Sequence, residues 1–417
     1  MLPEELPVWR FLEETAARLA RNRGFREIRP ALLEETELFT RSVGEVTDIV
    51  EKEMFTLEKG DTSLSLRPEG TAGIVRAYLE AGYARTQPVQ RLFHVGPMFR
   101  YERPQKGRER MFTQFDVEAL GSTDPRLDAE VVSLAAEFFE ALGLEGLEVR
   151  LNSMGDGEDR DRYRLALRAH LEPLLPEHCE LCRARFERNV FRVLDCKNPR
   201  CKELRRDVPG ILEFLSSENR QHFEAVRTLL GDLGRAVVLD PMLVRGFDYY
   251  TRTVFELHYA GLGARSALCG GGRYDHLIRD LGGPDLGAVG FAIGFTGTLL
   301  ALRELGREPA RRGEETPLVF VAAAGEDLER EVFSLAEELR SAGLSAVYDV
   351  EGRGLKAQMK LAGRGGHRFA VVFGADEAAR GTVQLKDLEG GEQREIPRGT
   401  LVAEIGSALP GAARGGT

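Results

Sequence analysis

The chain has 417 residues, of which 42% are hydrophobic and 30% charged, and it carries a net charge of −10 at pH 7. This profile is typical of a soluble globular protein, and the length predicts two or three domains. It excludes a protein that is basic throughout, but not one that binds nucleic acid through a local basic patch.

The N-terminus does not have the pattern of a targeting segment. Its first residues, MLPEELPVWRF, are acidic and contain prolines, unlike a secretory signal peptide. No apolar run approaches the roughly 20 residues that cross a bilayer. Five cysteines, an odd number, argue against a secreted disulfide scaffold. We therefore expect a cytoplasmic protein with no membrane span.

The first elements predicted are a helix and a strand-to-helix turn. Residues 4–22 have apolar side chains at helical spacing and end before Gly24. After a short strand and a connecting segment, SLSLRPEGTAGIVRAYLEAG predicts a strand that runs into a helix. Glu69 and Thr71 lie at the turn, where a carboxylate and a hydroxyl can either cap the helix or bind an ammonium group.

Residues 89–120 predict two strands around a polar loop, and residues 124–142 an amphipathic helix. The loop has five positive charges in eleven positions, at Arg100, Arg103, Lys106, Arg108 and Arg110. Such a loop is suited to reading phosphates, although a solvated hairpin explains the same charges.

Residues 155–235 predict an inserted helical module that contains two pairs of cysteines. Cys179 and Cys182 are separated by two residues, and Cys196 and Cys201 by four. Four thiolates at this spacing can hold a tetrahedral structural zinc ion, but reduced cysteines in a helical hairpin give the same pattern.

The stretch LVRGFDYYTRTVFE, residues 243–256, is the strongest candidate for a ligand site. An alternating pattern predicts a strand from Tyr250, with Tyr250, Arg252, Val254 and Glu256 on one face. Gly246 leaves room beside Arg245, whose guanidinium group is suited to a phosphate or carboxylate. The glycines of CGGGRYD, residues 269–275, then allow close backbone approach to a ligand and bring Arg273, Tyr274 and Asp275 into the same neighbourhood. An edge strand with surface arginines is the alternative.

The C-terminal part predicts a separate α/β domain of roughly 90 residues after a charged linker, residues 304–316. A basic segment in this domain, suited to RNA, contains Arg353, Lys356, Lys360, Arg364 and Arg368. The sequence lacks GxxxxGK[ST], HExxH and GxSxG, and so shows no P-loop, zinc-protease helix or serine-hydrolase elbow.

Taken together, these segments resemble the histidyl-tRNA synthetase family of class II aminoacyl-tRNA synthetases. Four segments are close to the family's patterns and occur in its order: LRPEGTA (66–72), FRYERPQKGRERMFTQFDVE (99–118), LVRGFDYYTRTVFE (243–256) and GGGRYD (270–275). Residues 24–55 resemble the first half of the family's motif 1, through which its members dimerise. The resemblance covers nearly the whole chain.

The resemblance implies an α+β catalytic domain, in which helices flank an antiparallel sheet, with a helical insertion and a C-terminal α/β anticodon-binding domain. The expected boundaries are 1–150 and 237–303 for the catalytic core, 151–236 for the insertion, 304–316 for the linker and 317–417 for the anticodon-binding domain. It also implies a homodimer that uses ATP with Mg²⁺, histidine and tRNA(His) to make histidyl-adenylate and then histidyl-tRNA.

The resemblance further implies a role for individual residues. Arg100 and Arg245 would be catalytic, binding the α-phosphate of ATP. The expected histidine-binding residues are Glu69, Thr71 and Gln114 at the amino group and Glu118, Tyr250 and Tyr274 at the imidazole. The expected ATP-binding residues also include Glu102, Arg108 and Phe112, and those that meet the tRNA acceptor end are Gln105 and Arg110. Histidine activation needs no protein nucleophile or base, because the substrate carboxylate itself attacks ATP.

Two departures from the family pattern keep a second hypothesis open. Motif 3 normally has an arginine that binds ATP, and Gly297 occupies that position; Arg303, six residues on, is more than one helical turn away. The family's N-terminal RGTxD segment has no counterpart, since the sequence begins at the LPE that follows it. The alternative is a histidine-binding paralogue without aminoacylation, such as the regulatory subunit of ATP phosphoribosyltransferase. That subunit typically lacks the insertion and the anticodon-binding domain, which are both predicted here.

Overall fold

The structure is a computed structural model of the chain, and it describes residues 1–44, 47, 49–102, 109–265, 267–308 and 318–409. The chain divides into two compact units, of which the larger includes Val8–Ala310 and the smaller includes Arg311–Thr417. Within the described residues, no helix is both long enough and apolar enough to cross a membrane.

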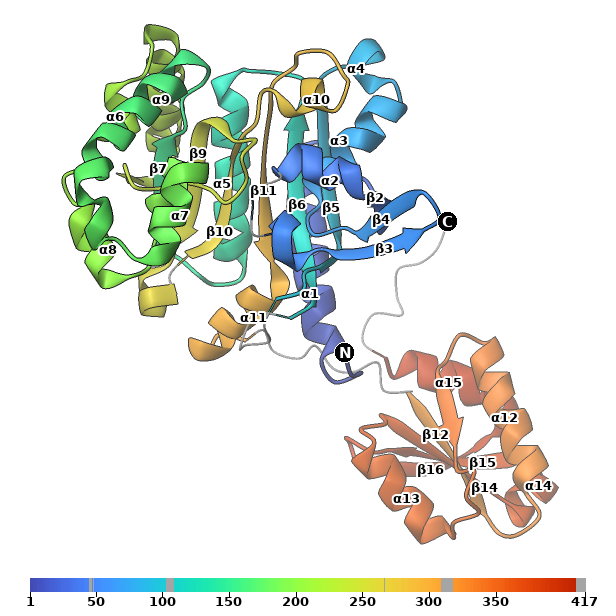
Figure 1. Cartoon of the computed structure of the whole chain (residues 1–417). Coiled ribbons are helices and arrows are strands. Elements are labelled where there is room, and N and C mark those ends of the chain that lie inside the picture. The colour runs from blue at the N-terminus through green and yellow to red at the C-terminus, as the bar shows by residue number, and fades with distance from the viewer. Residues whose placement is uncertain (45–46, 48, 103–108, 266, 309–317, 410–417) are drawn as a thin grey trace. The chain divides into compact units, whose positions relative to one another are not determined.

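An eight-stranded sheet in the order β1-β5-β6-β11-β10-β9-β7-β8 forms the centre of the larger unit (Figure 1). Its strands are β1 (Arg26–Glu27), β5 (Gln90–Phe99), β6 (Met111–Leu120), β7 (Glu148–Ser153), β8 (Ala236–Leu239), β9 (Thr251–His258), β10 (Ala267–Arg273) and β11 (Ala288–Gly294). The strands from β5 to β7 are antiparallel, as predicted, whereas the edge pairs β1–β5 and β7–β8 are parallel. The sheet is therefore mixed.

Helices α1 (Leu6–Asn22), α5 (Pro125–Ala141) and α11 (Phe295–Glu304) cover one face of this sheet. Their apolar side chains share one buried cluster with alternate residues of β6, including Phe115 and Val117. Helix α5 begins where the sequence predicts, because Asp124 accepts a hydrogen bond from the Arg126 N–H at 2.9 Å. This face is packed apolar core, so a polar site requires the opposite face.

Shorter elements border the opposite face. They are a three-stranded sheet in the order β2-β4-β3 and four short helices or helical turns, with the bounds β2 (Leu33–Glu35), β3 (Phe55–Lys59), β4 (Thr62–Leu66), α2 (Thr36–Val43), η1 (Ile49–Glu53), α3 (Thr71–Glu80) and α4 (Tyr83–Thr86). Helix α10 (Leu277–Asp280) packs with α3 around Tyr78.

The helical module joins β7 to β8 and lies at the β8 edge of the sheet (Figure 1). Its elements are α6 (Glu158–Leu171), η2 (Glu172–Glu177), α7 (Glu180–Arg188), η3 (Val190–Val193), α8 (Pro199–Leu204), η4 (Ile211–Glu213) and α9 (Ser217–Asp232). Helix α9 contributes to the main core, whereas α6, α7, η3 and α8 surround a separate small core. Outside the module, the short 3₁₀ helix η5 (Ala260–Arg265) connects β9 to β10.

The smaller unit has a five-stranded sheet in the order β13-β12-β14-β15-β16, with β13, β12 and β14 parallel and the rest antiparallel. Its elements are β12 (Val319–Ala324), α12 (Glu329–Ser341), β13 (Ala346–Tyr348), α13 (Leu355–Arg364), β14 (Phe369–Gly374), α14 (Ala375–Arg380), β15 (Thr382–Asp387), β16 (Gln393–Pro397), η6 (Arg398–Thr400) and α15 (Leu401–Ser407). Helices α12 and α15 pack on one face and α13 on the other.

Candidate active site

A cavity of about 250 Å³ lies on the polar face of the eight-stranded sheet. Seventeen residues from segments far apart in the sequence line it: Ile49, Glu69, Gly70, Thr71, Arg100, Gln114, Asp116, Arg245, Gly246, Phe247, Tyr249, Tyr250, Gly270, Tyr274, Gly290, Phe291 and Ala292. The cavity therefore brings together all four segments that carry the resemblance.

Two arginines contribute positive charge to the cavity. Arg100 follows β5 directly, and its Nε donates to the carbonyl of Pro68 at 2.8 Å. Arg245 precedes β9, and its Nη1 donates to Glu256 Oε1 at 2.6 Å. These acceptors use only part of the five N–H donors of each guanidinium group.

The glycines of GGGRYD make room for a protein side chain as well as for a ligand. A β-carbon added at Gly270 would lie 2.2 Å from Arg245 Nη1. Any larger residue would displace the guanidinium group. Gly270 is thus the reason that Arg245 can lie flat against β10.

Three acidic side chains lie at the base of the cavity. Glu69 and Asp116 line it, and Glu118 is 1% exposed just behind it. Glu118 accepts a hydrogen bond from Thr71 Oγ1 at 2.6 Å and another from the Tyr274 hydroxyl. Burial raises the pKa of Glu118 well above its ordinary value, and these two hydrogen bonds offset only part of that rise. Burial, followed by the charge of Glu69, likewise raises the pKa of Asp116.

Two buried acceptor atoms in this part of the cavity have no hydrogen-bond donor among the residues that the structure describes. They are Gln114 Oε1 and Asp116 Oδ2. Both residues line the cavity beside Glu69. Because unsatisfied buried acceptors are costly, this corner is suited to a ligand that brings several N–H donors and a positive charge, such as an ammonium group.

Glu69 itself is the cap of helix α3, the first of the two roles considered for it. Its carboxylate accepts the backbone N–H groups of Thr71 at 2.7 Å and Ala72 at 2.9 Å. The hydroxyl of Thr71 donates to Glu118 instead of capping. Capping leaves lone pairs on the Glu69 carboxylate, so the same group can also accept a ligand N–H.

Aromatic rings form one wall of the cavity. Tyr249 lies between Phe247, at 5.1 Å between ring centroids, and Tyr274, at 5.4 Å. Tyr250 lies 4.7 Å from Tyr249 and 6.0 Å from the guanidinium carbon of Arg245. Such a wall excludes water and offers flat surfaces to a planar ring.

The structure brings together most of the residues predicted for the site. Those that line the cavity are Glu69, Thr71, Arg100, Gln114, Arg245, Tyr250 and Tyr274. Glu118 contacts it through its hydrogen bonds to Thr71 and Tyr274.

Among the described residues, three other predicted site residues do not line the cavity. Phe112 lies against Arg100, with 5.3 Å between the guanidinium carbon and the ring centroid. The Glu102 N–H donates to the Arg100 carbonyl at 2.8 Å, and Arg110 packs over the Tyr101 ring at 4.2 Å. Gln105 and Arg108 fall outside the described residues.

The sequence reasoning missed Asp116, Phe247 and Tyr249. Asp116 lies midway between Gln114 and Glu118, and strand alternation places all three on one face of β6. The two-residue period of this strand is the signal from which Asp116 could have been predicted. Phe247 and Tyr249 belong to a segment already singled out, but the loop conformation before β9 could not be predicted.

The CGGGRYD segment lies beside the LVRGFDYYTRTVFE stretch, as predicted: Arg273 pairs with Thr251 between β10 and β9, and the Asp275 N–H donates to Thr251 Oγ1 at 3.1 Å. Arg273 does not line the cavity with Tyr274: it is fully buried, and its Nε donates to Asp128 at 3.1 Å and its Nη1 to Asp275 at 2.9 Å. The reason is the alternation of β10, which turns neighbouring side chains to opposite faces. The predicted face containing Tyr250, Arg252 and Val254 is also interrupted, because a register shift opposite Gly272 and Arg273 accompanies a positive φ of 38° at Arg252.

Gly297 lies in the first turn of α11 and is exposed. A β-carbon added there would meet no atom within 4 Å. Arg303, at the other end of α11, has its Nε 3.0 Å from Glu308 Oε1. The position of the missing arginine therefore has space for one.

A mixed sheet with an antiparallel centre, helices on one face, and a cavity on the other face that combines two arginines with buried carboxylates define the catalytic domain of a class II aminoacyl-tRNA synthetase. The sequence model described as "Histidyl-tRNA synthetase" matches residues 1–155 and 188–297, and that of the "Anticodon binding domain" matches residues 318–407. The chain belongs to the histidyl-tRNA synthetase family.

Individual relatives agree over nearly the full length. The histidine–tRNA ligase of Moorella thermoacetica is 49% identical, with 96% of this chain and 95% of the relative covered. The histidine–tRNA ligase of Desulforamulus reducens is 46% identical, covering 97% and 96%. The crystal structure of apo Staphylococcus aureus histidyl-tRNA synthetase has a TM-score of 0.79 and 36% identity, covering 97% of each chain. These likenesses favour the ligase over the regulatory-subunit alternative.

Proposed function

We propose that this chain activates histidine with ATP, in the presence of Mg²⁺, to form histidyl-adenylate, and then transfers the histidyl group to tRNA(His). The observation that carries the proposal is the shared cavity, with Glu118 and its hydrogen-bonded partners at the base and Arg100 and Arg245 beside it. A ligand that fills it meets both buried acceptors and guanidinium donors.

Histidine is the amino acid whose functional groups match these partners. Its ammonium group would replace the missing donors of Gln114 Oε1 and Asp116 Oδ2, next to Glu69. Its imidazole would donate an N–H to Glu118, with Tyr250 and Tyr274 beside the ring. A site built around that donor rejects an isosteric side chain that cannot donate, because Glu118 would then stay buried without its partner.

Activation requires positioning and charge neutralisation rather than a protein nucleophile. A histidine carboxylate oxygen attacks the α-phosphorus of ATP, the bond to the bridging oxygen breaks, and pyrophosphate leaves. Arg100 and Arg245 would neutralise the charge that develops on the α-phosphate. Mg²⁺ supplied with the nucleotide would neutralise charge on its phosphates. Glu102 and Phe112 lie next to Arg100, where they could contact the nucleotide.

The smaller unit would bind the tRNA anticodon. Lys356, Lys360 and Arg364 follow at intervals of four residues along α13 and are exposed, so they share one helix face. Arg353 and Arg368 instead pair with Asp349 and Asp387, respectively. We therefore assign the RNA contact to the exposed face of α13. Arg110, and Gln105 from the segment that is not described, would contact the acceptor end.

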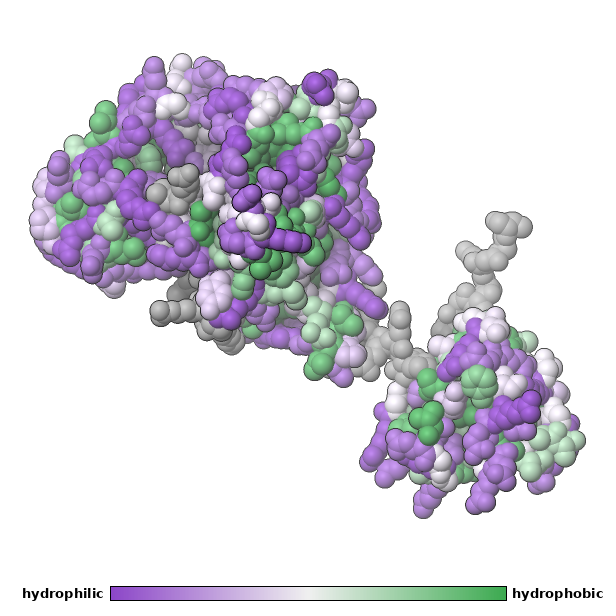
Figure 2. All heavy atoms as spheres, turned by 45° about the vertical axis from the view of Figure 1, so that its right-hand side comes forward, coloured by the Kyte–Doolittle hydropathy of each residue, from purple (hydrophilic) through white to green (hydrophobic). Residues whose placement is uncertain are grey.

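A homodimer in the cytoplasm is the expected form of the enzyme. Strand β2 of the three-stranded sheet lies within the segment that resembles motif 1, and β3 begins at the end of that segment. Exposed leucines occur at and beside these strands: Leu32, Leu33 and Leu57 are 47%, 40% and 55% exposed. Figure 2 shows hydrophobic areas among hydrophilic ones on the surface of the larger unit. Apolar side chains of this kind are suited to burial against a second copy.

Histidine-dependent exchange between ATP and pyrophosphate tests the proposal. The intact chain should catalyse it, and Arg245→Ala should reduce the rate by about 10²–10³, the effect of removing one preorganised donor. Arg91→Ala is the matched control, because Arg91 pairs with Glu130 at 2.9 Å and lies outside the cavity lining. Histidine binding without any exchange would instead favour the regulatory paralogue.

A further inference from the structure

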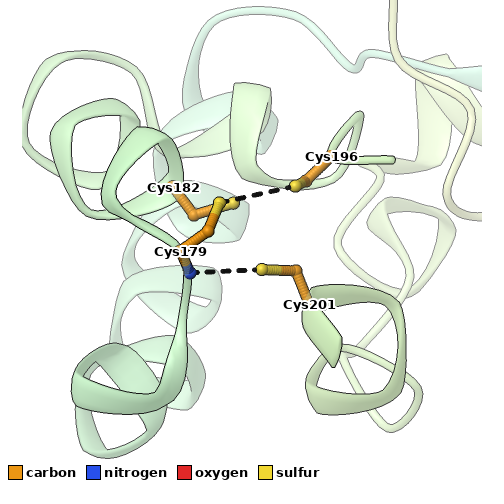
Figure 3. Close-up of side chains that lie close together, drawn as sticks. All are labelled: Cys179, Cys182, Cys196 and Cys201. Carbon is orange, nitrogen blue, oxygen red and sulfur yellow. Dashed lines mark hydrogen bonds between the residues drawn. The ribbon is translucent and has the colours of Figure 1, made fainter. Parts of the chain in front are cut away.

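The four cysteines of the helical module converge on one point, although they come from three separate segments. Cys179 caps α7 and Cys182 lies in its first turn, Cys196 follows η3, and Cys201 lies in α8. Figure 3 shows the four side chains pointing toward one another. Their sulfur atoms all lie within 4.8 Å of one another.

This spacing fits a single tetrahedral ion. Zinc–sulfur bonds of about 2.3 Å place the sulfurs of a tetrahedral site about 3.8 Å apart. The sulfurs of Cys179 and Cys196 are 3.8 Å apart. In addition, the backbone N–H of Cys179 lies 3.3 Å from the sulfur of Cys201, as a donor to a metal-bound thiolate would.

The charge around the cluster also favours a bound ion. A zinc ion with four thiolates carries a net charge of −2. Between Cys179 and Arg206 the sequence has nine arginines and lysines and only four acidic residues, in a chain that is acidic as a whole. This local excess of positive charge would stabilise the anionic site.

The module needs a further source of stability. Its separate core contains only thirteen buried residues, three of which are Cys182, Cys196 and Cys201. Helix α7 has 9 residues and α8 has 6, which is too short for either to be stable alone. A metal ion that links α7, η3 and α8 is the device that small domains use when their apolar core is limited.

We propose that Cys179, Cys182, Cys196 and Cys201 bind one structural zinc ion, which holds the helical module together. The ion takes no part in histidine activation. The module contacts the segment beside the active site through Asn189, which lies at the end of the metal-bearing helix α7. The Asn189 side-chain amide donates to Asp248 Oδ1 at 2.9 Å. Asp248 is adjacent to Tyr249, which lines the cavity.

Metal analysis of the intact chain, purified without chelator and under reducing conditions, tests the site. We expect about one equivalent of zinc per chain, and its release when a mercurial reagent titrates the thiols. Protein in which cobalt replaces zinc should show the sulfur-to-metal charge-transfer bands of a tetrahedral thiolate site. Zinc-free protein in which the four thiols of the cluster titrate freely, a disulfide between Cys179 and Cys196, or iron in place of zinc would each overturn the proposal.

A pair of variants tests which cysteines are ligands. Cys201→Ser should lose the zinc, whereas Cys269→Ala should keep it, because Cys269 lies on β10 and is not part of the cluster. If Cys201→Ser does not fold, the metal content of the intact chain still decides the question. Full zinc retention by a folded Cys201→Ser variant would show that Cys201 is not a ligand.

The structural role has a separate test. Removing zinc from the intact chain with a strong chelator should expose the segment between α6 and α9 to limited proteolysis, with the remaining larger unit resistant. Adding zinc back should restore protection. Equal protection of the module with and without bound zinc would overturn the structural role, whatever the metal content.

Discussion

Gly290 faces Glu118 directly across the pair of strands β11 and β6, and a β-carbon added at Gly290 would lie only 1.8 Å from Glu118 Oε2. The carboxylate therefore occupies the space that any other residue would fill. Glu118 can accept hydrogen bonds from Thr71 and Tyr274 at the base of the cavity only because its cross-strand neighbour has no side chain.

Gly290→Ala should consequently displace Glu118 and weaken histidine binding by on the order of 10- to 100-fold, the effect of losing a hydrogen bond to a charged group. The measurement is histidine affinity by calorimetry, with circular dichroism to verify folding. Gly294→Ala in the same strand is the control for folding, since its added methyl group would meet no atom within 4 Å. Unchanged affinity in Gly290→Ala would show that Glu118 does not contact the ligand.

Glu118→Gln should stabilise the ligand-free protein at neutral pH while weakening histidine binding. Burial raises the native pKa of this carboxyl group well above its unfolded value. Its favourable contribution to stability is therefore complete only below the unfolded pKa, and it is lost as the pH rises through the native pKa. As the pH rises above the unfolded pKa, ionisation of the carboxyl group favours the unfolded chain, and glutamine, which does not ionise, escapes this loss.

Thermal unfolding between pH 5 and 8 tests whether Glu118→Gln stabilises the ligand-free protein. The midpoint of the variant should exceed that of the parent by an amount that increases with pH. Glu145→Gln, at an exposed position, should change the midpoint little. A variant that is less stable than the parent at pH 8 would mean that the native pKa of Glu118 is not raised.

Much of the site could be predicted from the sequence because its residues lie in short continuous motifs. Arg100, Arg245, Tyr250 and Tyr274 were each identified in this way, and the folded chain brings them to one cavity. The parallel edges of the sheet, the bulge at Arg252 and the burial of Arg273 could not be predicted. They depend on which strands become neighbours, and strand neighbours are set by packing over long sequence separations.

Gly297→Arg should increase the exchange rate. Gly297 is exposed at the start of α11, and an added side chain meets open space there, so the arginine can be accommodated without rearrangement. If the guanidinium group reaches the nucleotide, a gain of up to about 10²–10³ is expected. Gly297→Lys, which adds charge without the planar fork, should gain less. An unchanged rate in both variants would show that another group already performs this role.

Lys360→Glu should weaken tRNA(His) binding without changing the exchange rate. Lys360 is exposed on α13, in the smaller unit, and exchange depends on the cavity of the larger one. Removing one phosphate contact should reduce the salt dependence of log affinity by about 1, as measured from 50 to 200 mM salt. Arg330→Glu on α12, an exposed position outside that basic segment, controls for the change in net charge. An equal loss in both variants would indicate a general electrostatic effect rather than a contact at α13.

Arg273→Met should destabilise the larger unit, because the substitution leaves the Asp128 carboxylate buried without Arg273. Arg273 and Asp128 are both completely buried and paired, and Asp128 also lies 3.2 Å from His222 Nε2. Removing one partner of such a pair costs about 3–5 kcal/mol, because the other charge stays buried. Arg227→Met removes an exposed arginine that pairs with Glu224, and it should cost less than about 1 kcal/mol. Chemical denaturation measures both, and the double variant Arg273→Met/Asp128→Leu should recover part of the loss. If Arg273→Met costs no more than Arg227→Met, the buried pair does not stabilise the contact between β10 and α5.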